Sequence, residues 1–121
     1  MAFILVAEDD AALATLIQEH LEDAGHEVVV VFDGEAAVDR ARRRRPDLMI
    51  MDVRMPGLSG PEAFKSLNDE FTRSTPAIFI SGLAPEQARK ETFLPLWSRG
   101  LLLHKPMDLV KLDAAISKLL G

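Results

Sequence analysis

Four short apolar runs in this chain each stop at residues that could handle a phosphoryl group or a metal ion. The runs cover residues 3–7, 48–51, 77–80 and 101–103, and the residues after them are Glu8, Asp9 and Asp10, then Asp52, then Ser81, and finally His104 and Lys105. If the runs are parallel strands of one sheet, these groups lie together at its carboxyl edge, where open α/β sheets bind ligands. The sequence therefore predicts a single, acidic site.

The acidic residues of this set have the chemistry of a divalent metal site. Carboxylates crowded at one edge repel one another, and a divalent cation relieves that repulsion. Clusters of Asp and Glu without His or Cys suit Mg²⁺, which keeps several waters and is usually completed by phosphate oxygens. We therefore expect magnesium at this edge.

The remaining residues complete a set for phosphoryl transfer. Asp52 stands alone after its run, so it is a candidate nucleophile as well as a ligand, and aspartyl phosphate is a known covalent intermediate. Lys105 would bring a compact positive charge to an incoming phosphoryl group, and the Ser81 hydroxyl could donate to one of its oxygens. Asp10 is better interpreted as a helix N-cap than as a third ligand.

The elements that position these groups alternate along the chain. Segments with helical period separate the apolar runs, which predicts βαβ units and a parallel sheet of five strands with five helices. The run 28–31 ends without a polar group of note, so it is expected to be an edge strand outside the site.

Helix boundaries follow from capping and breaking residues. The clearest helix follows Asp10 as N-cap and has Gly25 as its C′ residue, just beyond its end, and the second follows Asp33 until Pro46 ends it. Ser59 and Glu62 have the spacing of a capping box at the start of the third helix. The buried side chains of that helix are expected to be Phe64, Leu67 and Phe71, the segment 84–94 is expected to form a short or irregular helix, and Asp108 is expected to cap the last one.

Composition bounds the protein class. The chain has 121 residues, 48% of them hydrophobic, so we expect one domain over 1–121 with a real core. No apolar stretch approaches the roughly 20 residues of a membrane span, and the start lacks a signal-peptide pattern. The absence of cysteine fits a cytoplasmic setting, and the net charge of -5 argues against direct nucleic-acid binding. The arginines at 40 and 42–45 are interpreted as a solvated helix end.

The strings ILVAEDD, PDLMIMDVRMPGLSG, PAIFISG and LLLHKP, in this order and at these intervals, resemble the receiver domain of bacterial two-component response regulators, the CheY-like family, over the whole chain. The resemblance implies a three-layer (βα)5 flavodoxin-like fold, doubly wound, with strand order 2-1-3-4-5. It also implies a signalling phosphoacceptor that catalyses its own phosphorylation and slow dephosphorylation, rather than an enzyme with a separate substrate.

The resemblance assigns a role to each site residue. Asp52 matches the phosphoacceptor, Asp9 a direct Mg²⁺ ligand, and Glu8 a ligand that acts through water. The backbone carbonyl of Arg54 matches the third protein ligand of the metal. Ser81 and Lys105 match the hydroxyl residue and the lysine that respond to the phosphoryl group in the family. Pro106 matches a proline whose preceding peptide bond is cis.

The chain departs from the family pattern on its output side. Leu102 occupies the position, three residues before the lysine, where an aromatic residue usually stands. The segment 83–99 carries Pro85, Pro95 and the single tryptophan, Trp97, so we expect the signal to leave by a rearrangement of that segment. The implied partners are a histidine kinase or histidine phosphotransfer protein, and a downstream protein that contacts 83–105 and the last helix. The expected state is a monomer or weak dimer.

Two other functions fit parts of the sequence. A phosphate-independent interaction module with the receiver fold would agree with Leu102, but the intact set of site residues argues against it. A phosphohydrolase with an aspartate nucleophile commonly uses a second Asp two positions later as acid/base. Here Arg54 stands at that position, so phosphohydrolase activity is not expected.

Overall fold

The computed structural model describes residues 1–67, 74–92 and 100–121, and they form a five-stranded parallel sheet with helices on both faces. In the order β2-β1-β3-β4-β5 the strands are β2 (Glu27–Val31), β1 (Phe3–Ala7), β3 (Leu48–Asp52), β4 (Ala77–Ser81) and β5 (Gly100–His104). The helices are α1 (Ala11–Asp23), α2 (Gly34–Arg43), α3 (Gly60–Ser66), α5 (Pro85–Thr92) and α6 (Leu109–Leu120). This is the predicted flavodoxin-like fold, and β2 is the edge strand expected.

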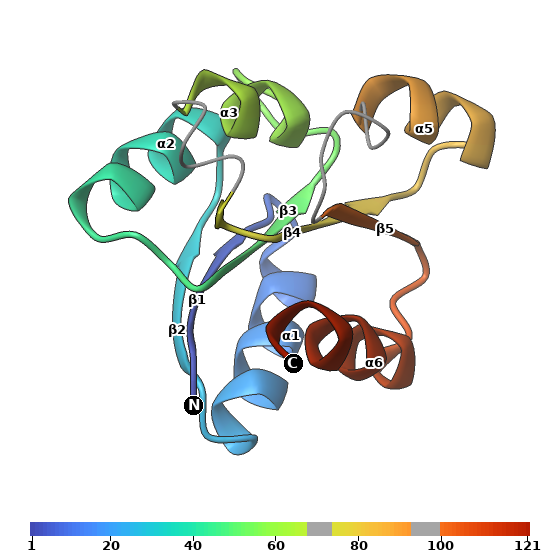
Figure 1. Cartoon of the computed structure of the whole chain (residues 1–121). Coiled ribbons are helices and arrows are strands. Elements are labelled where there is room, and N and C mark those ends of the chain that lie inside the picture. Colours follow the sequence, from blue (N-terminus) through green and yellow to red (C-terminus); the bar gives the residue numbers. More distant parts are fainter. Residues whose placement is uncertain (68–73, 93–99) are drawn as a thin grey trace.

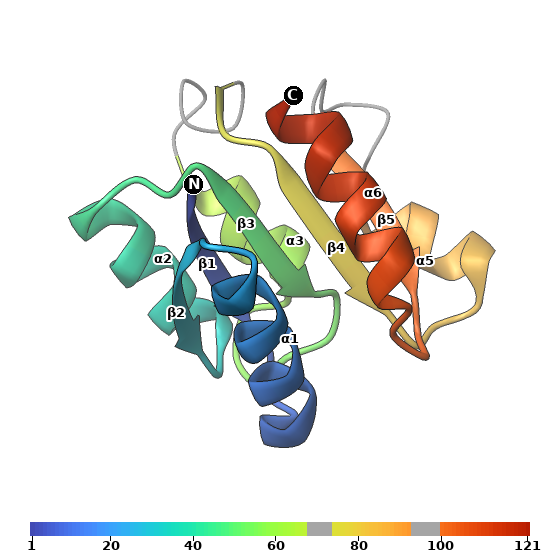
Figure 2. The ribbon, with the colours of Figure 1, turned by 90° about the horizontal axis from the view of Figure 1, so that it is seen from below.

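Helices cover the sheet in two layers. In Figure 1, α2, α3 and α5 lie on one face and α1 and α6 on the other, and Figure 2 shows α1 and α6 from their own side. Residues of β1, β3 and β4 are buried along their whole length, since both faces of a parallel sheet are covered. Alternate side chains enter two cores: Ile50 and Ile80 pack with α1 and α6, whereas Met51 and Phe79 pack with α2 and α3.

The predicted caps start the helices. The Asp10 side chain accepts hydrogen bonds from the backbone amides of Ala12 and Leu13 at the start of α1, at 3.0 and 3.2 Å. Ser59 and Glu62 form the predicted capping box of α3. Asp10 is therefore a helix cap, as interpreted from the sequence.

The third helix is shorter than predicted. It ends at Ser66, whose hydroxyl donates to the carbonyl of Ala63 at 2.7 Å, and Leu67 has extended backbone angles. The side chains of Phe64 and Leu67 are buried as expected. Phe71 lies outside the described residues, as do Pro95 and Trp97. The short helix predicted within 84–94 is α5, eight residues long.

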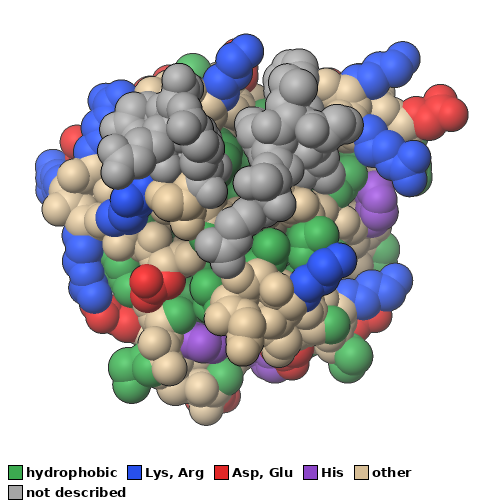
Figure 3. Space-filling model, in the orientation of Figure 1, with side chains coloured by type: hydrophobic (Ala, Val, Ile, Leu, Met, Phe, Trp, Pro, Cys, Tyr) green, Lys and Arg blue, Asp and Glu red, His purple; other side chains and the backbone are tan. Residues whose placement is uncertain are grey.

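The arginine-rich end of α2 is held by specific contacts. Figure 3 shows Lys and Arg side chains gathered at the side of the molecule where α2 lies. Arg44 forms a bidentate ion pair with Glu27, at 2.7 and 3.1 Å, and lies over the ring of Phe3. Arg45 donates to the hydroxyls of Ser74 and Thr75. The helix stops at Arg43, before Pro46, because Arg44 is extended so as to reach Glu27 on β2. Within the described ranges, no helix combines the length and apolar character that a membrane crossing requires.

Candidate functional site

The carboxyl ends of β1, β3 and β5 bring three of the predicted groups into contact. The Lys105 ammonium lies 2.8 Å from Oδ2 of Asp52 and 3.5 Å from Oε1 of Glu8. The strand order explains why these side chains lie together, because β3 is hydrogen-bonded to β1 on one side and to β4 on the other. Lys105 is held beside the end of β4, since its amide donates to the carbonyl of Ser81 at 2.7 Å. The single acidic site predicted from the strand ends is therefore present as a spatial cluster.

The two central carboxylates are buried together. Glu8 is 1% exposed and Asp52 5%, and both lie beside Lys105, whose side chain is 30% exposed. Burial raises the pKa of Glu8 to about 7; the amide of Asp10 opposes this by donating to Glu8, and the neighbouring Asp52 reinforces it. Burial alone would lower the pKa of Lys105, but the hydrogen bond and charge of Asp52, aided by Glu8, raise it above its usual value. The lysine thus stays charged and offsets part of the repulsion between the acids.

The donor set fits a magnesium ion. One carboxylate oxygen from each of Glu8, Asp9 and Asp52 lies within 4.8 Å of the other two. Asp9 is exposed to solvent, whereas Glu8 and Asp52 are buried. Among the buried side-chain atoms described, Oε1 of Glu8 accepts no hydrogen bond, and its one charged neighbour, the Lys105 ammonium, is 3.5 Å away, so this oxygen can still accept from the water of a bound cation. Oxygen ligands with one side open to water are the arrangement that Mg²⁺ prefers.

Arg54 contributes its backbone to the site and its side chain to a helix. Its amide donates to Oδ1 of Asp52 at 3.2 Å. Its guanidinium forms two hydrogen bonds with the carboxylate of Glu91 on α5, at 2.6 and 3.0 Å. Glu91 cannot be identified from the sequence, because nothing in the local pattern of α5 separates it from Glu86 on the same helix.

The other residues singled out from the sequence near β4 and β5 lie around this cluster. The Ser81 hydroxyl accepts a hydrogen bond from the amide of Leu83 at 2.9 Å. Leu102 is partly buried against the α2 and α3 core, and it lines a small cavity of about 180 Å³ between β5 and α6. His104, the last residue of β5, is exposed and does not join the cluster of Glu8, Asp52 and Lys105. The Lys105–Pro106 peptide bond is cis, as the resemblance implied.

Gly60 allows the backbone of α3 to approach that of Asp52. A Cβ atom at residue 60 would lie 2.2 Å from the carbonyl oxygen of Asp52, and the amide of Gly60 donates to the carbonyl of Val53 at 3.1 Å. This contact keeps the loop after β3 folded back against the strand. Only glycine fits here without moving the backbone of Asp52.

We expect Gly60→Ala to lower the free energy of unfolding by about 1–3 kcal/mol, because the new methyl group must displace backbone rather than a flexible side chain. Urea unfolding measures this change. The matched control is Gly82→Ala, because a Cβ there meets only the Cδ of Lys105, at 3.8 Å, and should change stability little. Equal effects of the two substitutions would contradict the close approach at Gly60.

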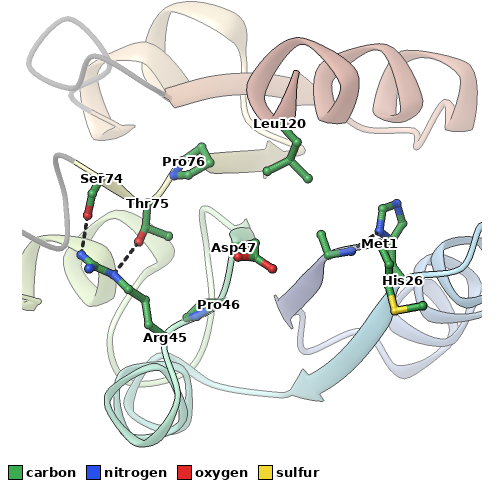
Figure 4. A pocket seen from close by; sticks show the side chains of 10 residues that line it. Met1, His26, Arg45, Pro46, Asp47, Ser74, Thr75, Pro76 and Leu120 are labelled. Carbon is green, nitrogen blue, oxygen red and sulfur yellow. Dashed lines mark hydrogen bonds between the residues drawn. The ribbon is translucent and has the colours of Figure 1, made fainter.

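A separate cavity of about 550 Å³ lies at the opposite edge of the sheet. Figure 4 shows its lining, with Arg45 pointing toward Ser74 and Thr75 and with His26 beside the start of the chain. His26 accepts a hydrogen bond from the amide of Ala2. The polar groups of this cavity therefore hold together the amino ends of strands, and the cavity is remote from Asp52.

Comparison with sequence families and curated proteins finds consistent relatives. The family model described as the response regulator receiver domain matches residues 4–117. The transcriptional regulatory protein CrdR of Helicobacter pylori is 36% identical over 115 residues, which is 95% of this chain and 53% of that protein. The polar-differentiation response regulator DivK of Brucella anthropi is 34% identical over 82 residues, or 67% of each chain. This chain thus spans about half the length of CrdR and two thirds of DivK.

Solved structures with the same fold include further receivers. The chemotaxis response regulator CheY4 of Vibrio cholerae superposes with a TM-score of 0.86 at 27% identity, covering 98% of both chains. The receiver domain of the sensor histidine kinase PA1611 from Pseudomonas aeruginosa superposes with a TM-score of 0.85 at 29% identity, covering 99% of this chain and 98% of that one. The latter structure holds a magnesium ion coordinated in its active site cleft.

Proposed function

Because this chain belongs to the response regulator receiver family, we propose that Asp52 accepts a phosphoryl group from a histidine kinase or a histidine phosphotransfer protein. The observation that carries this proposal is the ammonium of Lys105 at 2.8 Å from the buried carboxylate of Asp52. A buried nucleophile beside a fixed positive charge suits attack on an anionic phosphoryl group. The proposed unit of function is a receiver domain over residues 1–121.

The transfer step follows from the groups at the site. A carboxylate oxygen of Asp52 attacks phosphorus, a new P–O bond forms, and the P–N bond to the donor histidine breaks with its electron pair leaving on the imidazole. Lys105 stabilises the charge on the transferred oxygens, and the Ser81 hydroxyl donates to one of them after leaving its contact with Leu83. Positioning and charge neutralisation provide most of the rate, and water later hydrolyses the acyl phosphate.

Magnesium is the proposed cofactor. The residues that would hold it are Glu8 through water, the carboxylates of Asp9 and Asp52, and the backbone carbonyl of Arg54. When bound, Mg²⁺ neutralises negative charge on the phosphoryl oxygens and on the carboxylates. The buried Oε1 of Glu8, which accepts no hydrogen bond, and the magnesium-bound receiver of PA1611 support this assignment.

Magnesium is expected to stabilise the folded chain, by about 2.7 kcal/mol at a concentration one hundred times its dissociation constant. Asp9→Asn should remove most of that gain, because it deletes a charged ligand. Asp10→Asn is the matched control, since it removes a charge from the adjacent residue but keeps a good N-cap. Thermal unfolding with Mg²⁺ or with a chelator measures both. Equal losses in the two variants would contradict Asp9 as a ligand.

The direct test of the proposed function is incubation with acetyl phosphate and Mg²⁺, followed by intact mass measurement. We expect the mass of one phosphoryl group to be added, and chelation of the metal to prevent it. The absence of an adduct, under conditions that phosphorylate a control receiver, would contradict the proposal.

We propose a protein partner as the output of this domain. The surface around α5, β5 and α6 adjoins Ser81 and Lys105, so a change at the site reaches it over a short path. The proposed state is a cytoplasmic monomer or weak dimer that binds no nucleic acid directly, in agreement with the net charge of -5.

A further inference from the structure

The ion pair between Arg54 and Glu91 connects the acidic site to α5. Arg54 lies two residues after Asp52 and donates its amide to that carboxylate, whereas Glu91 stands near the end of α5, 37 residues away in the chain. Gln87 also donates to Glu91, from one turn earlier on the helix, at 3.3 Å. Arg54 therefore contacts Asp52, the proposed acceptor, with its backbone, and it contacts α5 with its side chain.

This ion pair is exposed to water, so Arg54 can exchange Glu91 for another partner. The side chain of Arg54 is 60% exposed and that of Glu91 is 30% exposed, so water screens their attraction and the pair contributes little stability. The two residues line an open cavity of about 440 Å³ next to the loop after β3, and the guanidinium is therefore not enclosed by core atoms. Arg54 can leave Glu91 at small cost.

Phosphorylation places a stronger partner within reach of the same guanidinium. It replaces one carboxylate charge at Asp52 with a group of about −1.5 to −2 charges and three acceptor oxygens. Arginine binds such oxygens through charge-assisted, often bidentate hydrogen bonds. The backbone of Arg54 is already fixed 3.2 Å from Oδ1 of Asp52, so its long side chain starts beside the place where those oxygens would lie.

We propose that Arg54 exchanges partners on phosphorylation, leaving Glu91 for the phosphoryl group on Asp52, and that this exchange frees α5 to move. The inference rests on the proposed function of Asp52. It offers a route for the signal that does not need an aromatic side chain at the position of Leu102, since the link to α5 is an ion pair instead.

Competition of this kind fixes the signs of two effects. Glu91→Gln removes the competing carboxylate, so it should tighten the binding of beryllofluoride with Mg²⁺, used as the phosphoryl mimic, by about two- to fivefold. Arg54→Met removes the side chain that would move to the mimic, so it should weaken binding by a similar factor. Simple loss of structural support would weaken binding in both variants.

The experiment measures four properties of the whole chain. Fluorine NMR reports whether the beryllofluoride complex forms, and titration gives its affinity. Amide hydrogen exchange follows α5, and proton–nitrogen NMR follows the Nε–H group of Arg54. In the wild type, complex formation should speed exchange in α5 about two- to fivefold and shift the Nε–H resonance of Arg54. In Glu91→Gln, exchange should already be fast without the mimic. Glu86→Gln, which removes an exposed charge from the first turn of the same helix, should behave as the wild type.

The outcomes separate this inference from the function on which it rests. If no beryllofluoride complex forms in the wild type, the proposed function fails and the exchange fails with it. If the complex forms but the Arg54 resonance and α5 exchange do not change, or if Glu91→Gln weakens binding, only the partner exchange is overturned.

Discussion

Asp52→Asn is expected to abolish phosphorylation by acetyl phosphate, with a rate at least about 10⁴-fold below that of the wild type. The amide has nearly the shape of the carboxylate but is a poor nucleophile, and it carries no charge to help hold a cation. The Asp52 side chain is 6% exposed and is held by Lys105 and by the amide of Arg54. An isosteric replacement therefore removes the chemistry and keeps most of the packing. Intact mass after timed incubation with Mg²⁺ measures the rate.

Asp39→Asn provides the matched control. Asp39 is an exposed aspartate on α2 that pairs with Arg43 one turn away, and its loss should leave phosphorylation at the wild-type rate. Both variants should unfold cooperatively, which excludes misfolding as the cause of a missing adduct. A phosphoryl adduct on Asp52→Asn at the wild-type rate would place the acceptor on another residue.

The strands and the strand-end cluster could be predicted because they depend on local sequence. The strands β1, β3 and β4 are buried on both faces, so each contains a continuous apolar run that is recognisable in the sequence. Parallel packing then brings the residues after these runs to one edge without further information. The contact of Lys105 with Asp52, 53 residues apart in the chain, follows from that topology alone.

The end of α3 could not be predicted in the same way. Its start has a capping box, but no Gly or Pro marks its end, and the helical pattern of apolar residues continues through Leu67 to Phe71. The helix nevertheless stops at Ser66, where Leu67 takes extended backbone angles. Tertiary packing of Leu67, which is buried, outweighs helix propensity there.

The ion pair between Arg54 and Glu91 also could not be predicted from sequence patterns. The resemblance gives Arg54, two residues after Asp52, a role only through its backbone carbonyl. Its side-chain partner depends on how α5 sits over the sheet, and that placement is set by packing between elements rather than by local sequence. Contacts between a strand-end loop and a distant helix can therefore be identified only from the structure.

Packing beneath the site is expected to set the stability of the whole domain, and Phe79→Ala tests this. Phe79 is fully buried on β4, two residues before Ser81, and its ring meets that of Phe64 edge to face with centroids 6.0 Å apart. Truncation should lower the free energy of unfolding by about 3–5 kcal/mol, through lost burial and the cavity left behind. This is a large share of the roughly 5–15 kcal/mol typical of a domain, so the urea midpoint should fall sharply at an unchanged slope.

Phe32→Ala makes the same chemical change at an exposed site. Phe32 is 53% exposed, so its truncation should alter stability by no more than about 0.5 kcal/mol. A double-mutant cycle with Phe64→Ala should further give a coupling of about 0.5–1.5 kcal/mol between the two buried rings. Additive effects of Phe64→Ala and Phe79→Ala would contradict their edge-to-face contact, and equal costs at Phe32 and Phe79 would contradict the placement of β4 in the core. Because Phe79 and Ser81 lie on one strand, loss of this packing should also loosen the edge of the sheet that carries the proposed site.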